Sequence, residues 1–190
     1  MTMKRSTIMT AIFALAFAGL GGAAFGTGLS VTVKAGYFFP TDTVFREVYK
    51  SGLVYGGEVT VPVAGALYLW AGADLFGKTG LLSVSEEKTK VRIIPLFAGL
   101  RAQFGKKNTR PYIGAAAAYF LFHEENPLGT ISDSGLGLIA RTGLLTRLAG
   151  ALWLDIFADY RTCTVRTDGN DPLQAKLDGF SAGLGLAYRF

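Results

Sequence analysis

The 190-residue chain is long enough for one domain with a sizeable core and too short for two ordinary ones. Half of its residues are hydrophobic, 25 are glycine and only 17% are charged, below the roughly 25% of soluble domains, which favours a membrane barrel or another all-β fold. The net charge of +5 is not concentrated in a basic, aromatic-rich run, so we expect no nucleic-acid partner. Because Cys163 is the only cysteine, no internal disulfide or Cys/His metal spacing is possible, and we predict no cofactor and no metal.

The first 26 residues have the organisation of a secretion signal. Lys4 and Arg5 precede an apolar run over 8–20, and small residues follow it. A membrane-anchoring helix is the alternative, but the run is shorter than the ~20 residues that a spanning helix needs. We therefore predict a signal peptide over 1–26, cleaved after Ala24 or, as a second choice, after Gly26, and a mature domain over 27–190. No cysteine follows the apolar run, which excludes a lipid-anchored form.

From residue 29 onward, apolar and polar residues alternate with a period near two, which predicts β-strands. The connections alternate in length: 40–51, 77–88, 123–134 and 166–176 are long, whereas 64–65, 104–109 and 148–150 are short. Bacterial outer-membrane barrels show this pattern, with long external loops and short periplasmic turns. We predict an all-β fold, an eight-stranded antiparallel transmembrane barrel with both termini in the periplasm. Its strands would be 29–39, 52–63, 66–76, 89–103, 110–122, 135–147, 151–165 and 177–190.

The alternation also predicts which side chains face lipid and which face the lumen. In 151–165 every charge falls on one face, opposite Leu152, Leu154 and Ile156. In 66–76 either face could be apolar, and only Asp74 favours placing the aromatic residues inside. Arg92 and Arg101 have opposite parity in 89–103, so one lies at a rim or a bulge intervenes. A bulge is also suggested by a proline at position 95, which lacks a ladder donor.

The inward face carries charges of both signs. Two interpretations are open: a buried ion-pair network that fills the narrow lumen, which we favour, or a polar path for a solute. The predicted network is Lys34, Glu58, Arg92, Arg141, Asp155, Asp159 and Arg161, joined by Asp74 if the aromatic face of 66–76 points inward.

Several segments resemble the small outer-membrane β-barrel family that contains OmpX- and OmpW-like proteins. They are VKAGYFFPTD at 33–42, YGGEV at 55–59, RPYIGAAAAYF at 110–120 and LGLAYRF at 184–190. The resemblance implies a location in the bacterial outer membrane, lipid as surroundings, a monomer, and a terminal signature read by the barrel assembly machinery. That signature is Leu184, Leu186, Tyr188 and Phe190.

Residues for catalysis are few. The only histidine, His123, lies beside Glu124 and Glu125, and no serine lies two residues to either side, unlike the pattern of barrel lipid-A deacylases. We expect Cys163 to be a small lumen or rim residue. We therefore predict a non-enzymatic envelope protein with a structural or surface-interaction role, like OmpX-type barrels. One alternative is a narrow conduit for small apolar molecules, as proposed for OmpW-type barrels, and a weaker one is an exported soluble ligand-binding barrel, which the apolar outward face disfavours.

Overall fold

The computed structural model describes residues 28–190 except 82–87, 106–107, 127–128 and 167–173. The predicted signal peptide, 1–26, lies outside the described residues. Within the described ranges, no helix has the length and apolar character needed to cross a membrane.

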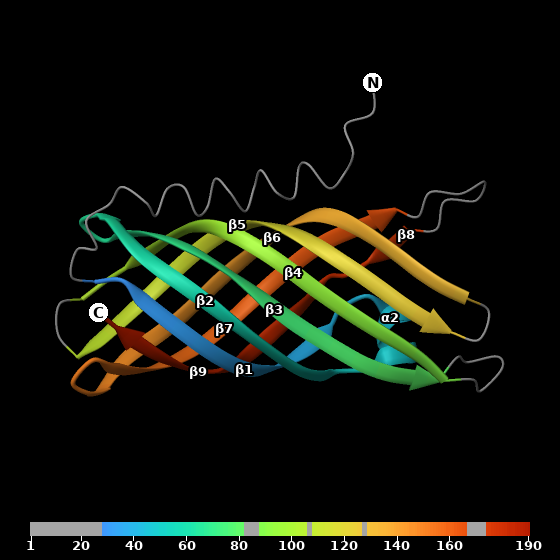
Figure 1. Cartoon of the computed structure of the whole chain (residues 1–190), viewed down its shortest axis with the longest axis horizontal. Coiled ribbons are helices and arrows are strands. Elements are labelled where there is room, and N and C mark those ends of the chain that lie inside the picture. Colours follow the sequence, from blue (N-terminus) through green and yellow to red (C-terminus); the bar gives the residue numbers. More distant parts are fainter. Residues whose placement is uncertain (1–27, 82–87, 106–107, 127–128, 167–173) are drawn as a thin grey trace, which may run out of the picture.

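In the described residues, eight strands form a closed antiparallel barrel (Figure 1). Each strand from β1 to β7 pairs with the next, β7 pairs with β9, and β9 pairs with β1, so the ladder returns to its start. A short strand, β8 (Gln174–Lys176), pairs with the far end of β7. The predicted eight-stranded antiparallel fold is confirmed. The barrel strands are β1 (Ser30–Pro40), β2 (Gly52–Ala64), β3 (Leu67–Leu81), β4 (Lys88–Gln103), β5 (Thr109–Asn126), β6 (Gly129–Ala149), β7 (Leu152–Arg166) and β9 (Gly179–Arg189).

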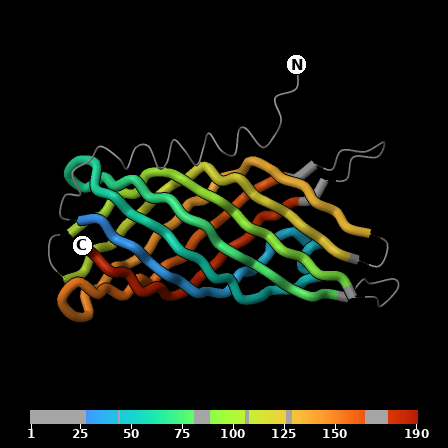
Figure 2. The backbone as a smooth tube through the Cα atoms, viewed as in Figure 1, coloured from blue at the N-terminus to red at the C-terminus, as the bar shows by residue number. Residues whose placement is uncertain are grey.

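The two ends of the barrel differ, and we call them the turn end and the loop end (Figure 2). At the turn end, tight turns join β2 to β3 and β6 to β7, with Gly65 and Gly150 at positive φ of 54° and 53°. Residues with a side chain rarely adopt this conformation, which explains glycine there. The first described residue meets the C-terminal residue at the turn end, where the Gly28 N–H donates to the Phe190 carbonyl oxygen at 2.8 Å.

Three strands extend further toward the loop end than the sequence predicted. Ladder pairs continue to Leu81 in β3 and to Asn126 in β5, and β6 begins at Gly129. Parts of the predicted loops 77–88 and 123–134 are therefore strand. Hydrophobic alternation marks only the part of a strand that lies in lipid, whereas backbone pairing can continue beyond it with polar side chains.

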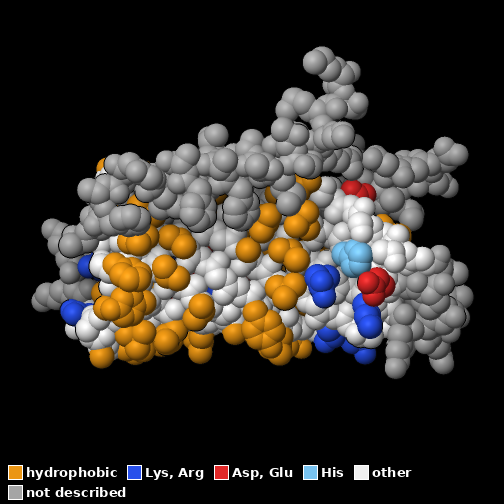
Figure 3. Space-filling view, viewed as in Figure 1, with side chains coloured by type: hydrophobic (Ala, Val, Ile, Leu, Met, Phe, Trp, Pro, Cys, Tyr) orange, Lys and Arg blue, Asp and Glu red, His pale blue; other side chains and the backbone are white. Residues whose placement is uncertain are grey.

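Side chains on the outer face form an apolar belt (Figure 3). Leu136, Leu138 and Val33 are among the most exposed, at 76%, 61% and 65%. In β3, Leu67, Leu69 and Leu75 face outward. Trp70, Asp74 and Phe76 are buried inside, so Asp74 indicated the orientation of the strand correctly. A belt of this kind would be costly in water and suits lipid.

Strand β4 has no bulge, contrary to the expectation from its proline. Its register with β3 is the same on both sides of Pro95, and its pairing with β5 is continuous. Parity is therefore kept along the strand, which buries Arg101 inside and leaves Arg92 exposed on the outer face near the loop end. The prediction that Arg92 faces the lumen was wrong.

A short helix, α2 (Thr43–Tyr49), lies at the loop end in the segment predicted as a loop. Asp42 caps it by accepting a hydrogen bond from the Phe45 N–H at 2.9 Å. Phe45 and Tyr49 are buried against the barrel interior, with the Phe45 ring 6.2 Å from the Phe76 ring. A Cβ on Gly80 would lie 2.5 Å from the Val48 carbonyl oxygen, so α2 packs directly on β3.

The barrel interior contains two apolar clusters. The smaller cluster fills the turn end, and the larger, rich in phenylalanine, fills the loop end beneath α2. Residues of the turn-end cluster are Tyr112, Leu145, Trp153, Phe157 and Ala187.

Candidate functional site

Between the two apolar clusters, charged side chains from six strands meet in the middle of the lumen. We call them the charge layer. All eight are buried, and four carry each sign. They are Lys34 of β1, Glu58 of β2, Asp74 of β3, Arg101 of β4, Arg141 of β6, and Asp155, Asp159 and Arg161 of β7.

Glu58 lies at the centre of the layer and contacts three cations. Arg101 Nη2 donates to Oε1 at 2.6 Å, and Lys34 Nζ donates to Oε2 at 3.2 Å. Arg141 Nη1 also donates to Oε2. A carboxylate has lone pairs for several donors, and charged donors make the strongest of these bonds. Glu58 therefore joins β1, β2, β4 and β6 across the lumen.

Asp74 and Asp159 form the second part of the network. Arg161 Nη2 lies 3.2 Å from Asp74 Oδ2 and 3.0 Å from Asp159 Oδ1. Arg141 Nη2 donates to Asp159 Oδ2 at 2.6 Å, and Lys34 Nζ lies 2.9 Å from Asp74 Oδ1. Since Arg141 and Lys34 contact both parts, seven of the eight charges form one connected network.

Aromatic rings enclose the cations of the layer. The Arg101 guanidinium lies 4.7 Å from the Trp70 ring centre and 4.2 Å from that of Tyr112. Arg141 lies 4.8 Å from the Trp70 ring centre. The eighth charge, Asp155, accepts a hydrogen bond from the Tyr112 hydroxyl at 2.8 Å. Cation–π contacts of this kind gain strength away from water.

The charge layer closes the lumen to water-sized particles. The side chains of Glu58, Arg141 and Asp159 are 0% exposed. A continuous aqueous path through the middle of the barrel would leave a water-accessible surface on these groups. Eight-stranded barrels have interiors just wide enough for side chains, and here paired charges fill that space.

The structure brings together six of the seven predicted lumen residues, and Asp74 with them. Arg92 lies on the outer face, and Arg101 is the arginine of β4 that lies in the lumen, where Arg92 was predicted. The signal that could have found Arg101 is parity: it shares a face of β4 with Phe97, Ile93 and Val91, all buried. The bulge inferred from Pro95 concealed that signal.

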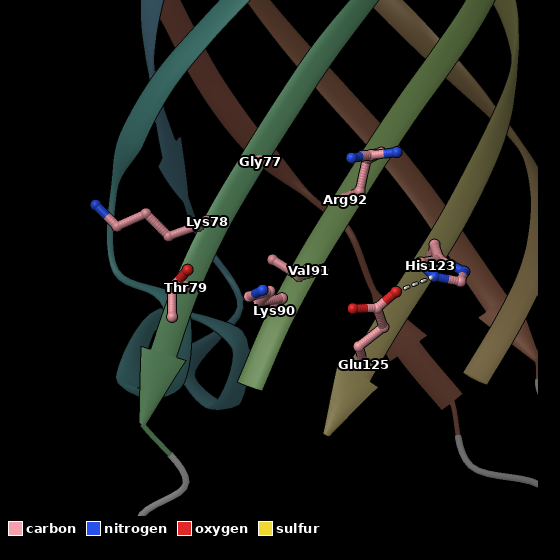
Figure 4. A pocket seen from close by; sticks show the side chains of 8 residues that line it. All are labelled: Gly77, Lys78, Thr79, Lys90, Val91, Arg92, His123 and Glu125. Carbon is pink, nitrogen blue, oxygen red and sulfur yellow. Dashed lines mark hydrogen bonds and ion pairs between the residues drawn. The ribbon is translucent and has the colours of Figure 1, made fainter. Parts of the chain in front are cut away.

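His123 contacts Ser132 as well as Glu125, and the sequence alone did not show the contact with Ser132. Its Nδ1 lies 2.7 Å from the Ser132 hydroxyl oxygen on β6. Its Nε2 lies 3.3 Å from Glu125 Oε1, a contact that Figure 4 shows. These are triad residue types, but the His123 and Glu125 side chains are 41% and 57% exposed. In catalytic triads the acid is buried and fixes the base in one orientation. Cys163 is buried, and the described residues contain no cluster of ligands for a metal ion.

The residues of the predicted terminal signature lie on the outer face of β9 and at Phe190, which directly follows it. Leu184, Leu186, Tyr188 and Phe190 are all exposed on the apolar belt, as their alternation predicts. Whether the assembly machinery reads them stays a prediction.

The sequence matches no protein-family model and no curated protein. Solved outer-membrane barrels do match the structure. OprG from Pseudomonas aeruginosa is 14% identical over 86% of this chain and 96% of its own, with a TM-score of 0.68. Neisserial surface protein A is 14% identical over 85% of this chain and 97% of its own, at 0.61. Outer membrane protein W of E. coli is 16% identical over 88% of this chain and 100% of its own, at 0.54.

These likenesses, together with the closed ladder and the apolar belt, define the class. By its fold the protein is a small eight-stranded β-barrel of the outer-membrane type. The outer-membrane location expected from the sequence agrees with the compared structures. At these identities the likeness concerns the fold.

Proposed function

We propose that the protein is a non-enzymatic outer-membrane barrel with a structural or surface-interaction role, and that its loop end faces the exterior. One observation carries the proposal: the charge layer fills the lumen with buried ion pairs. A barrel built in this way presents its loop end to partners and has no central aqueous route. The closed ladder leaves no free barrel edge for strand pairing, which supports a monomer surrounded by lipid. In this proposal the barrel assembly machinery inserts it.

Thiol labelling of intact cells tests the orientation. Lys50 lies exposed at the loop end and Ala64 lies exposed at the turn end. An impermeant maleimide should label Lys50→Cys in intact cells, and should label Ala64→Cys only after the outer membrane is permeabilised. The native Cys163 is buried and serves as an unreactive background. The reverse labelling pattern would contradict the proposal.

The non-enzymatic part of the proposal is tested at Ser132. We expect no hydrolysis of nitrophenyl esters or phospholipids that depends on this hydroxyl, because the neighbouring imidazole and carboxylate are open to solvent. Ser132→Ala should therefore behave as the unmodified protein. Ser134→Ala is the matched control, since Ser134 lies on the same strand but contacts Tyr119 instead of His123. If the unmodified protein and Ser134→Ala hydrolyse the ester and Ser132→Ala does not, the protein is an enzyme and the proposal is wrong.

A conduit for small apolar molecules is the second candidate, favoured by the apolar cluster between the charge layer and α2. Because the charge layer blocks the middle, such a solute would have to leave sideways through the barrel wall. Phe45→Ala/Tyr49→Ala would loosen the cover at the loop end. A conduit predicts faster entry of an apolar fluorescent dye into cells with this variant, whereas the structural role predicts no change.

A further inference from the structure

Polar residues form a distinct site on the outer face of β3, β4 and β5 near the loop end. Gly77 pairs with Arg92, and Arg92 pairs with His123, so the three lie side by side. Lys90 follows on the same face of β4, closer to the loop end, opposite Glu125. These residues line a depression of about 240 Å³ (Figure 4).

Within the described part of the chain, the two cations of this site, Lys90 and Arg92, have no ionic partner. Every arginine of the charge layer contacts a carboxylate, but among the described residues no carboxylate lies within ion-pair distance of Lys90 or Arg92. Glu125 contacts His123 instead, at 3.3 Å. As far as the described residues go, the charges of Lys90 and Arg92 are therefore available to an external anion.

Apolar residues adjoin the site on the side of the barrel middle. Ile94 and Leu121 pair with each other, two residues along their strands from Arg92 and His123 toward the middle of the barrel. Beyond the apolar belt, basic side chains, the histidine and an acidic side chain gather at this end in Figure 3. A ligand that fits both surfaces has an anionic head and apolar chains.

We propose that Lys90 and Arg92 bind the phosphate of a lipid in the leaflet around the loop end. A guanidinium donates two parallel hydrogen bonds to phosphate oxygens, and a lysine adds a point charge. His123, whose two ring nitrogens contact Ser132 and Glu125, lies beside Arg92 and borders the site. The acyl chains lie on Ile94 and Leu121. The identity of the leaflet rests on the proposed function, which places the loop end outside.

Gly77 gives the site its depth. A Cβ built there meets nothing closer than the Val91 carbonyl oxygen at 4.0 Å, so a side chain can be added without a backbone clash. It would occupy the space next to Arg92 where a phosphate would lie. Gly77→Leu therefore fills the site without changing any charge.

The test is native mass spectrometry of the purified protein in detergent micelles with bis-phosphorylated lipid A. Dephosphorylated lipid A and inorganic phosphate are the comparison ligands. The unmodified protein should bind the dephosphorylated lipid at least about tenfold more weakly than bis-phosphorylated lipid A. Lys90→Gln/Arg92→Gln should bind bis-phosphorylated lipid A at least about tenfold more weakly than the unmodified protein does. Either change removes charge-assisted hydrogen bonds between the protein and the phosphate. Gly77→Leu should also weaken binding. Arg46→Gln/Lys50→Gln is the matched control, because it removes two exposed cations at the same end, one in α2 and one at its C-cap.

Each opposite result overturns the proposal. It is wrong if Lys90→Gln/Arg92→Gln or Gly77→Leu binds as the unmodified protein does, or if the control loses as much affinity. Equal binding of the dephosphorylated lipid would remove the phosphate from recognition, and displacement by an equal concentration of inorganic phosphate would indicate a soluble anion instead of a lipid. Micelles have no sidedness, so reversed thiol labelling would refute the orientation in the proposed function and leave this result intact.

Discussion

Arg141 is the side chain whose loss should weaken the barrel most. It donates to Glu58 and to Asp159, lies 3.7 Å from Asp74, and is 0% exposed. In Arg141→Ala the balanced charge layer gains a net negative charge in the centre of the lumen. Removing one partner of a buried pair costs about 3–5 kcal/mol, because the other charge is left without compensation.

The size of the effect follows from the partners that remain. Glu58 keeps Arg101 and Lys34, and Asp159 keeps Arg161, so neither carboxylate is stranded completely. The lost stacking on Trp70 adds to the cost. We therefore expect the free energy of unfolding to fall by about 3 kcal/mol, at the lower limit of that range.

Urea unfolding in phospholipid vesicles, followed by tryptophan fluorescence and by the gel shift of the folded barrel, measures this change. Arg141→Lys should cost less, since it keeps the charge but loses the forked geometry. Arg46→Ala, on the exposed face of α2, is the control for loss of an arginine and should change little. If Arg141→Ala is as stable as Arg46→Ala, the charge layer does not hold the barrel together.

Three further perturbations address the terminus, the belt and α2. Phe190 is 62% exposed, and its N–H donates a hydrogen bond to the Leu29 carbonyl oxygen. Deleting Phe190 should leave export intact but lower the yield of folded barrel, measured by gel shift. An unchanged yield would contradict this prediction. Ile156→Arg should cost about 2–4 kcal/mol if it lies near the bilayer midplane. The adjacent Asp155→Asn should cost less because it keeps a partner in Tyr112, and reversed costs in urea unfolding would mean that the faces are misassigned. Gly80→Val should displace α2 and speed tryptic cleavage after Arg46 or Lys50. Gly77→Ala is the control, because it adds a methyl group in open space. Equal cleavage rates in the two variants would refute the packing of α2 on β3.

The barrel could be predicted from the sequence because its signal is repeated in most of the strands. Most strands alternate apolar and polar residues, and the ambiguous strand β3 is oriented by a single charge, Asp74. The connections alternate in length independently of that pattern. Two separate patterns therefore indicated the same fold.

The site was predicted less well because it depends on which residues meet across the lumen. Parity could place Arg101 inside only once β4 was known to run without a bulge. The contact of His123 with Ser132 joins two strands, and no local spacing in the sequence reports it. Helix α2 had a local signal, the cap at Asp42 with Phe45 and Tyr49 four residues apart, but it was hidden in a segment that read as a loop.

Single-channel recording in planar lipid bilayers shows whether paired charges close the lumen. Seven charges in one connected network leave no water-accessible surface on Glu58, Arg141 or Asp159, so the account predicts that the unmodified protein passes no ionic current. Successful insertion is established separately by the gel shift of the folded barrel. A reproducible open conductance from folded, inserted protein, reduced or altered by Arg141→Ala, would show that the charges line a path and would contradict the account.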